Sequence, residues 1–205
     1  MKGDSGIVCA YRHEATMRLA RVEISNYKSL RDVTFAPGAV SVLVGPNAAG
    51  KSNLVDALDF IGDVYRWGLE AAVRHKGGYE NICYRHSRRT KAPIRFRVIL
   101  TDRVRAGRGS HPRPMQDVTL DHTLEFRTSS QGIGSAFTVN LERLQVYEER
   151  PAGARQEAMH LTRAVGKRAE FMGRDDSALL PAGLDVSILS DVLNAVGPDD
   201  LISFI

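Results

Sequence analysis

Cysteines, long apolar runs and a signal sequence are scarce or missing in this 205-residue chain, and each absence excludes a class of protein. The only cysteines, Cys9 and Cys83, offer neither a disulfide framework nor metal-ligand spacing. No stretch approaches the roughly 18 apolar residues of a membrane span, and residues 1–16 lack the apolar core of a signal peptide. We therefore expect no membrane partner and a reducing cytoplasm as the default location.

One octapeptide, residues 45–52, fits the phosphate-binding pattern G-x-x-x-x-G-K-[ST]. The apolar run Val40–Val44 before it predicts a buried strand, and apolar residues at helical spacing from Leu54 to Tyr65 predict a helix after it. Strand, glycine loop and helix in this order form the context that the pattern requires. The sequence therefore predicts a nucleotide-binding chain.

Each residue type in this loop has a physical role. Gly45 and Gly50 allow the backbone to bend so that N–H groups from about Asn47 to Ser52 can face phosphate oxygens. Lys51 would supply an ammonium group to the β- and γ-phosphates, and the Ser52 hydroxyl is the expected protein ligand of Mg²⁺. ATP and Mg²⁺ are accordingly the expected ligands.

Two further sequence elements point to a family. The run Arg21–Leu30 contains Asn26-Tyr27-Lys28-Ser29, and Lys51-Ser52-Asn53-Leu54-Val55-Asp56-Ala57-Leu58 completes the phosphate loop. Together they resemble the amino-terminal lobe of the ABC-class ATPases related to RecF, SMC proteins and the overcoming-lysogenization-defect nucleases. Residues 76–82 and 94–100 resemble the continuation in a branch of bacterial AAA-type ATPases, so the resemblance covers about residues 17–100.

The resemblance implies a head domain that binds ATP, pairs with a second head across two sandwiched nucleotides and works on or near DNA. It also implies that Lys28 contacts a phosphate, whereas a solvated turn lysine is the alternative. Asn47 is expected to contribute through its backbone N–H. The predicted nucleotide-binding residues are Gly45, Pro46, Asn47, Ala48, Ala49, Gly50, Lys51, Ser52, Asn53 and Lys28.

Strands are expected on both sides of the loop and helix. Leu19–Ile24 and Asp32–Phe35 precede the loop, and alternating apolar residues between 94 and 163 predict half-buried antiparallel strands. In one of them Phe137, Val139 and Leu141 should share a face. His122 falls on an apolar face, where a histidine is expected to be a hydrogen-bonded core residue rather than a metal ligand.

The predicted fold class is α/β: the amino-terminal lobe of a P-loop NTPase of the ABC-ATPase kind, with an antiparallel β-rich arm. We expect a disordered leader at residues 1–16 and a nucleotide-binding core at residues 17–93. The arm should follow at residues 94–168. Residues 169–205 are expected to be a loop and the start of a helical region, truncated after the apolar stretch Leu201–Ile205.

The basic residues are unevenly spread. The formal net charge is +4, yet residues 85–113 hold ten lysines or arginines and the single acid Asp102. One interpretation is a surface that contacts DNA phosphates. The other is a solvated strand face with a mobile loop, because Arg95 and Arg97 alternate with apolar residues.

The sequence lacks several motifs that would complete a hydrolytic site. No apolar strand ends in Asp-Glu, and Asp102 and Asp121, which come nearest, are expected to be surface acids. The segment Leu189–Val192 begins like the Leu-Ser-x-Gly signature of the family, but Val192 replaces the glycine.

We therefore expect this chain to bind ATP without efficient turnover, and the full-length protein to hydrolyse it. The alternative is a non-catalytic nucleotide-dependent interaction module or a truncated remnant. A GTPase is excluded because its Asn-Lys-x-Asp motif is absent, and a small-molecule kinase would show a mainly helical lid where this chain shows strands.

Overall fold

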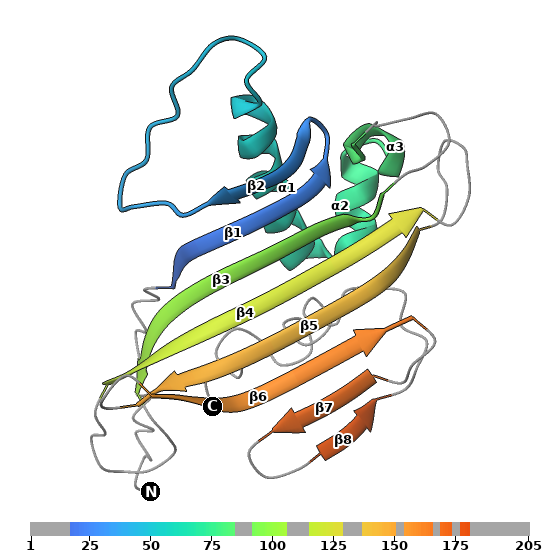
Figure 1. The fold of residues 1–205 in the computed structure, drawn as a ribbon. Helices are drawn as coiled ribbons and strands as arrows, with labels where there is room; N and C mark the ends of the chain where they lie inside the picture. The colour runs from blue at the N-terminus through green and yellow to red at the C-terminus, as the bar shows by residue number, and fades with distance from the viewer. Residues whose placement is uncertain are drawn as a thin grey trace, which may run out of the picture.

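One antiparallel sheet organises the computed structural model of this chain, which describes residues 17–84, 92–105, 115–128, 137–150, 154–165, 169–173 and 177–180 (Figure 1). Its eight strands lie in the order β2-β1-β3-β4-β5-β6-β7-β8. Apart from β1 and β3, strands that are neighbours in the sheet are also consecutive strands of the chain. The strands are β1 (Arg18–Tyr27), β2 (Leu30–Phe35), β3 (Ile94–Arg105), β4 (Met115–Thr128), β5 (Phe137–Glu149), β6 (Arg155–Ala164), β7 (Ala169–Gly173) and β8 (Ser177–Leu180).

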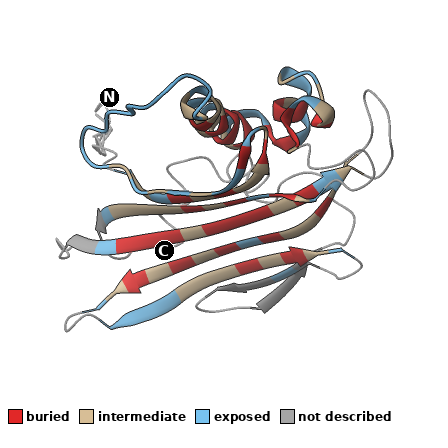
Figure 2. Ribbon diagram, turned by 45° about the horizontal axis from the view of Figure 1, so that its top comes forward, coloured by how far each residue is buried: buried red, intermediate tan, exposed pale blue. Residues whose placement is uncertain are grey.

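Three helices, α1 (Lys51–Trp67), α2 (Leu69–His75) and α3 (Tyr79–Ile82), lie on one face of the β2, β1, β3 and β4 side of this sheet (Figures 1 and 2). The core lies between the helices and the sheet. Its centre is aromatic, with ring centroids 5.5–6.1 Å apart among Tyr27, Phe60, Phe96 and Phe126. Such tilted, edge and stacked contacts add to the free energy gained by burying the rings.

The strand predictions on either side of the loop are confirmed in type and place. Leu19–Ile24 and Asp32–Phe35 lie within β1 and β2, and the two strands pair as a hairpin. In β3 the alternating apolar residues point into the core, where Ile94, Phe96 and Val98 are buried. The period of two in the sequence therefore identified which side chains of β3 face the helices.

The prediction that Leu141 shares a face of β5 with Phe137 and Val139 is wrong. The pairing of β4 with β5 shifts between Glu125 and Phe126, which pair with Leu141 and Val139, so Asn140 is an extra residue on β5. Such a bulge reverses the facing of every later side chain. As a result Leu141 is only half-buried, while Glu142 is fully buried.

The expected buried strand at Val40–Val44 is also wrong. This segment forms neither helix nor strand and belongs to the exposed loop between β2 and α1 (Figure 2). Val40 and Val44 are 85% and 88% exposed. The physical reason is that β2 ends the sheet, and no described strand pairs with Val40–Val44, so a β-branched sequence alone cannot form a strand there.

Residues 169–173 and 177–180, expected to be a loop, form β7 and β8, which pair antiparallel with each other, with β7 next to β6. The leader at residues 1–16 and the segment 181–205 lie outside the described residues. The division into a core and an arm stays a prediction; β1 and β3, one on each side of the expected boundary, are direct neighbours in the sheet. None of the described helices is long and apolar enough to cross a membrane.

Candidate nucleotide-binding site

The phosphate loop borders a hollow of about 400 Å³ at the start of α1. Seven of its lining residues are consecutive, Asn47–Asn53, and the eighth is Ser29 of the β1–β2 turn. Of the predicted binding residues it contains Asn47, Ala48, Ala49, Gly50, Lys51, Ser52 and Asn53. The structure therefore brings most of the predicted set together around one space, while Gly45 and Pro46 form the loop's approach to it.

Backbone conformation explains the two positions where the loop turns most sharply. Gly50 stands just before the helix with a left-handed φ of 88°, and Ala48 also has a positive φ of 65°. A Cβ atom at Gly50 would lie 3.4 Å from both the Ser29 Oγ and the Leu30 side chain. Glycine at this position therefore permits both the turn and the close approach of the β1–β2 turn.

The side chain of Lys51 folds back onto the phosphate loop. Its Nζ donates to the carbonyl oxygens of Gly45 and Pro46 at 2.7 and 2.6 Å. The first turn of α1 contains no acidic residue, and no side chain caps it. Backbone N–H groups, an ammonium group and the hydroxyls of Ser29 and Ser52 therefore surround the hollow, a set that favours an anion.

The β1–β2 turn is fastened to α1 beside this hollow. Asn53 donates its side-chain N–H to the Ser29 Oγ at 2.6 Å. Asn26 and Lys28 both have positive φ values, 61° and 48°. The Lys28 N–H donates to the carbonyl of Ile82 at 2.7 Å, so the turn is also held by the end of α3. The two sequence elements that carry the family resemblance are thus in contact.

Lys28 itself forms an ion pair with α1. Its Nζ lies 2.6 Å from Asp56 Oδ2, and the Tyr27 hydroxyl donates to the same oxygen at 2.6 Å. Lys76 bridges Asp56 Oδ1 and Asp59 Oδ2 at 3.0 and 2.7 Å. These contacts join β1, α1 and the end of α2. The contact between Lys28 and a phosphate stays a prediction, since in this arrangement the ammonium is paired with Asp56.

The carboxyl group of Asp56 is strongly held in its ionised form. Partial burial alone would raise its pKa, but hydrogen bonds from Lys28, Tyr27 and Lys76 outweigh this and lower the pKa to about 2. Burial and then the hydrogen bond to Asp56 raise the pKa of Tyr27. Tyr27 therefore stays a neutral donor and Asp56 a charged acceptor.

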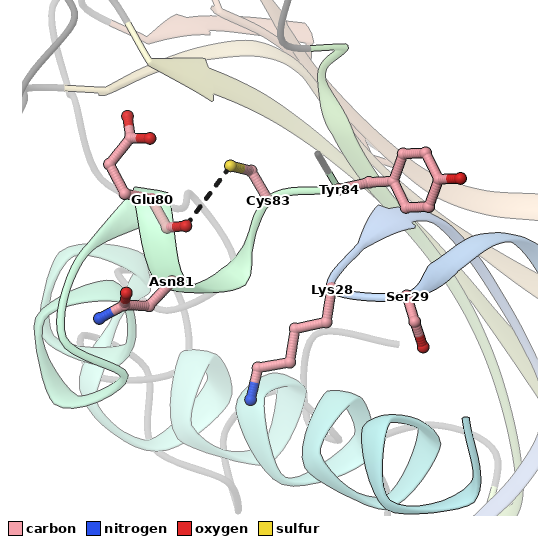
Figure 3. A pocket seen from close by; sticks show the side chains of 6 residues that line it. All are labelled: Lys28, Ser29, Glu80, Asn81, Cys83 and Tyr84. Carbon is pink, nitrogen blue, oxygen red and sulfur yellow. Dashed lines mark hydrogen bonds between the residues drawn. The ribbon is translucent and has the colours of Figure 1, made fainter. Parts of the chain in front are cut away.

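A second hollow of about 390 Å³ lies on the other side of Ser29. Lys28 and Ser29 line one side of it, and residues of α3 and the chain after it line the other (Figure 3). In Figure 3 the Lys28 side chain extends toward α1, in agreement with its ion pair. The remaining lining residues are Glu80, Asn81, Cys83 and Tyr84. Ser29 lines both hollows. Lys28, the residue before it, lines only the second one.

Sequence reasoning missed Ser29, Asp56 and Lys76 as parts of this site. Ser29 lies in the quoted Asn-aromatic-basic-Ser element, and Asp56 lies five residues after Lys51 in the quoted helix, so a signal for both was present in the resemblance. Nothing in the sequence links Lys76 to Asp56, because that contact depends on how α2 folds back onto α1.

Part of the basic segment is neutralised within the sheet. Arg97 contacts Asp121 with its Nη2 at 2.6 Å, and these charge-assisted hydrogen bonds raise the pKa of Arg97. Arg103 lies 2.8 Å from Asp117. These pairs favour the interpretation of a solvated strand face for residues 92–105. Residues 85–91 and 106–113 of the segment, and the signature-like Leu189–Val192, lie outside the described residues.

Two expectations about individual side chains have clear outcomes. His122 is buried at 1% exposure and is hydrogen-bonded between Tyr65 and Glu142 at 3.1 and 3.2 Å, as expected of a core histidine. The expectation that Asp121 is a surface acid is wrong, because its side chain is only 14% exposed and is paired with Arg97. Its pairing with Arg97 accounts for this carboxylate without a role at the phosphate loop.

The loop, the start of α1 and Lys51 lie together as the phosphate-binding sequence pattern predicts, although Val40–Val44 before the loop forms no strand. A family model described as an AAA ATPase domain matches residues 17–91. No solved structure matches the chain at a comparable level of significance.

Three known proteins share short similar stretches with this chain. Structural maintenance of chromosomes protein 1 of Saccharomyces cerevisiae is 45% identical over 47 residues, which cover 22% of this chain and 4% of that protein. OLD nuclease of Thermus scotoductus is 38% identical over 48 residues, or 23% of this chain and 9% of the nuclease. Chromosome partition protein Smc of Methylococcus capsulatus is 40% identical over 65 residues, or 30% of this chain and 5% of that protein.

These short, partial matches support an ABC/SMC-like P-loop ATPase portion at the amino-terminal end of the chain, in line with the AAA ATPase domain model over residues 17–91. The chain spans less than a tenth of the length of each of these three relatives.

The lowered pKa of Asp56 predicts how the free energy of unfolding changes in acid. The ionised carboxylate stabilises the fold above its unfolded pKa of about 4, and this stabilisation is lost as the pH falls toward about 2. In urea unfolding, Asp56→Asn should be destabilised by about 2 kcal/mol at pH 7 and by much less at pH 2.5. A constant difference between the two proteins over this range would contradict the ion-pair assignment.

Proposed function

We propose that this chain binds ATP and Mg²⁺ at the phosphate loop, as the amino-terminal lobe of a RecF/SMC-like ATPase head. The observation that carries the proposal is the hollow of about 400 Å³ at the start of α1, lined by Asn47–Asn53 and free of acids in the first helical turn. This arrangement suits the negative charge of a triphosphate.

Lys51 is placed to exchange partners when a nucleotide arrives. It donates to two neutral carbonyl oxygens, of Gly45 and Pro46, within its own loop. Phosphate oxygens are anionic acceptors, and charge-assisted hydrogen bonds are shorter and about twice as strong as neutral ones. A nucleotide can therefore take the Lys51 ammonium from the carbonyls without first breaking an ion pair.

The residues present suit Mg²⁺ in part. Ser52 lies in the first turn of α1 and lines the hollow, and a hydroxyl oxygen is a ligand that Mg²⁺ accepts in a shell completed by phosphate and water oxygens. Bound there, Mg²⁺ would neutralise charge on the β- and γ-phosphates. The chain's own part is to hold the phosphates through the loop and to present the Ser52 oxygen.

ATP hydrolysis is proposed only for a full-length protein in which a second lobe would complete this one. The sequence has no apolar strand ending in Asp-Glu, and the chain spans less than a tenth of its relatives. The exposed run Val40–Val44 supports a second lobe, because its β-branched residues would gain burial and hydrogen bonds from a neighbouring strand. Pairing of two such heads on ATP binding belongs to the same proposal.

Work on or near DNA is supported by the names of relatives that maintain or partition chromosomes and of a nuclease. Arg97 and Arg103 are already paired with acids, so a DNA contact would depend on the other basic residues of segment 85–113.

Removal of three of these charges tests the DNA contact. Neutralising Arg105, Arg108 and Arg113 should lower the salt concentration at which the chain elutes from duplex DNA, since fewer counterions would be released on binding. Equal elution of variant and wild type would contradict the DNA contact while leaving ATP binding untouched.

Binding of ATP is tested most simply with Lys51→Ala. Loss of the ammonium should weaken Mg-ATP binding by about tenfold to a hundredfold, the size of a hydrogen bond to a charged group, as measured by calorimetry. Arg66→Ala is a matched control, because it removes an exposed cation from the other end of α1. Equal affinities of the two variants would contradict the assignment of the site.

A non-catalytic nucleotide-dependent interaction module is the second candidate, favoured by the missing Asp-Glu strand. The two functions differ in whether the full-length protein releases phosphate from ATP. We expect release that Lys51→Ala abolishes while the thermal unfolding curve stays unchanged. Binding without release in the full-length protein would favour the interaction module.

A further inference from the structure

The carboxylate of Asp56 has three partners, Tyr27, Lys28 and Lys76, and Lys28 is followed by Ser29, which lines the hollow of the phosphate loop. We propose that Lys28 pairs with Asp56 when no nucleotide is bound and leaves Asp56 for a phosphate group when a nucleotide binds, so that Asp56 competes with the ligand and tunes the affinity of the site for anions. This inference rests on the proposed binding of ATP and assigns to Asp56 a positioning role, exerted through Lys28.

The β1–β2 turn places Lys28 close enough for such an exchange. Ser29, the next residue, lines the hollow of the phosphate loop and accepts a hydrogen bond from Asn53 at 2.6 Å. A Cβ atom at Gly50 would come within 3.4 Å of the Ser29 Oγ. Lys28 has a flexible four-carbon stem and lines the adjoining hollow, so its ammonium can turn from α1 toward the loop while its backbone stays fixed.

The Lys28 backbone is held by contacts that the exchange would not disturb. Its N–H donates to the Ile82 carbonyl at 2.7 Å, and Tyr84 N–H donates to the Asn26 carbonyl at 2.8 Å. Asn26 in turn donates its side-chain N–H to the Pro93 carbonyl at 2.9 Å. Only the side chain of Lys28 would need to move.

Asp56 remains satisfied after Lys28 leaves. Its Oδ2 keeps the Tyr27 hydroxyl at 2.6 Å, and its Oδ1 keeps Lys76 at 3.0 Å. Lys76 is itself anchored to Asp59 at 2.7 Å. An unpaired, partly buried carboxylate would oppose the exchange, and these remaining partners remove that cost.

The charge of the ligand decides whether the exchange occurs. The Lys28–Asp56 pair is partly exposed, with 29% and 26% of the two side chains accessible, so its stabilisation is modest and a polyphosphate can compete with it. A neutral nucleoside offers no anion to Lys28. The contact of Lys28 with phosphate therefore favours nucleoside triphosphates over nucleosides, and competition from Asp56 reduces this preference.

A double-mutant cycle with the full chain tests this role. We expect Asp56→Asn to tighten Mg-ATP binding about fivefold, the size of the partly exposed ion pair that no longer competes, and to leave adenosine binding unchanged. In a Lys28→Ala background the same substitution should have no effect. Asp59→Asn, one turn away, is the matched control and should change ATP affinity less than twofold.

An unchanged or weakened ATP affinity in Asp56→Asn would overturn the inference, and so would an equal gain in the Lys28→Ala background. In the second case Asp56 would act on the ligand without Lys28. Failure of the wild-type chain to bind ATP would contradict both this inference and the proposed function. Normal binding by wild type, lost in Lys51→Ala but insensitive to Asp56→Asn, would contradict this inference alone.

A measurement on the wild-type chain does not depend on how the variants fold. The NMR signal of the Lys28 Cε, assigned by its loss in Lys28→Ala, should shift on addition of Mg-ATP and stay in place with adenosine. A Lys28 Cε signal whose chemical shift does not change at saturating Mg-ATP would overturn the inference.

Discussion

The burial of one face of α1 against the sheet fixes where the phosphate loop stands. Phe60 packs among Tyr27, Phe96 and Phe126, so α1 is held at its middle by β1, β3 and β4. Tyr27 then joins the core to the site, because its ring is fully buried and its hydroxyl donates to Asp56. The packing of Phe60 therefore positions α1 on the sheet, and the phosphate loop is attached to the start of this helix.

Local pattern sufficed for the elements whose stability is local or periodic. The glycine loop and the helix after it follow from residue types within one short window, and the strands follow from a period of two. Val40–Val44 has an equally strong pattern, yet it is exposed because a strand also needs a neighbour. Sequence pattern thus predicted the capacity of this segment to form a strand but could not supply its partner.

Long-range geometry explains what sequence reasoning missed. A single extra residue, Asn140, reverses the facing of β5 and buries Glu142, which then meets His122 and Arg163 in the interior. Likewise Asp56 meets Lys28 and Lys76 only because the β1–β2 turn and α2 both fold against α1. These charged contacts join residues about 20 or more positions apart, so no local pattern announces them.

The most direct test of the account is a map of backbone amide NMR shifts on titration of this chain with Mg-ATP. If ATP binds at the phosphate loop, the largest changes should fall on residues 45–53, with smaller changes at Lys28 and Ser29. Changes centred on another part of the sheet, or no changes at saturating Mg-ATP, would contradict the central claim that the start of α1 is a nucleotide site.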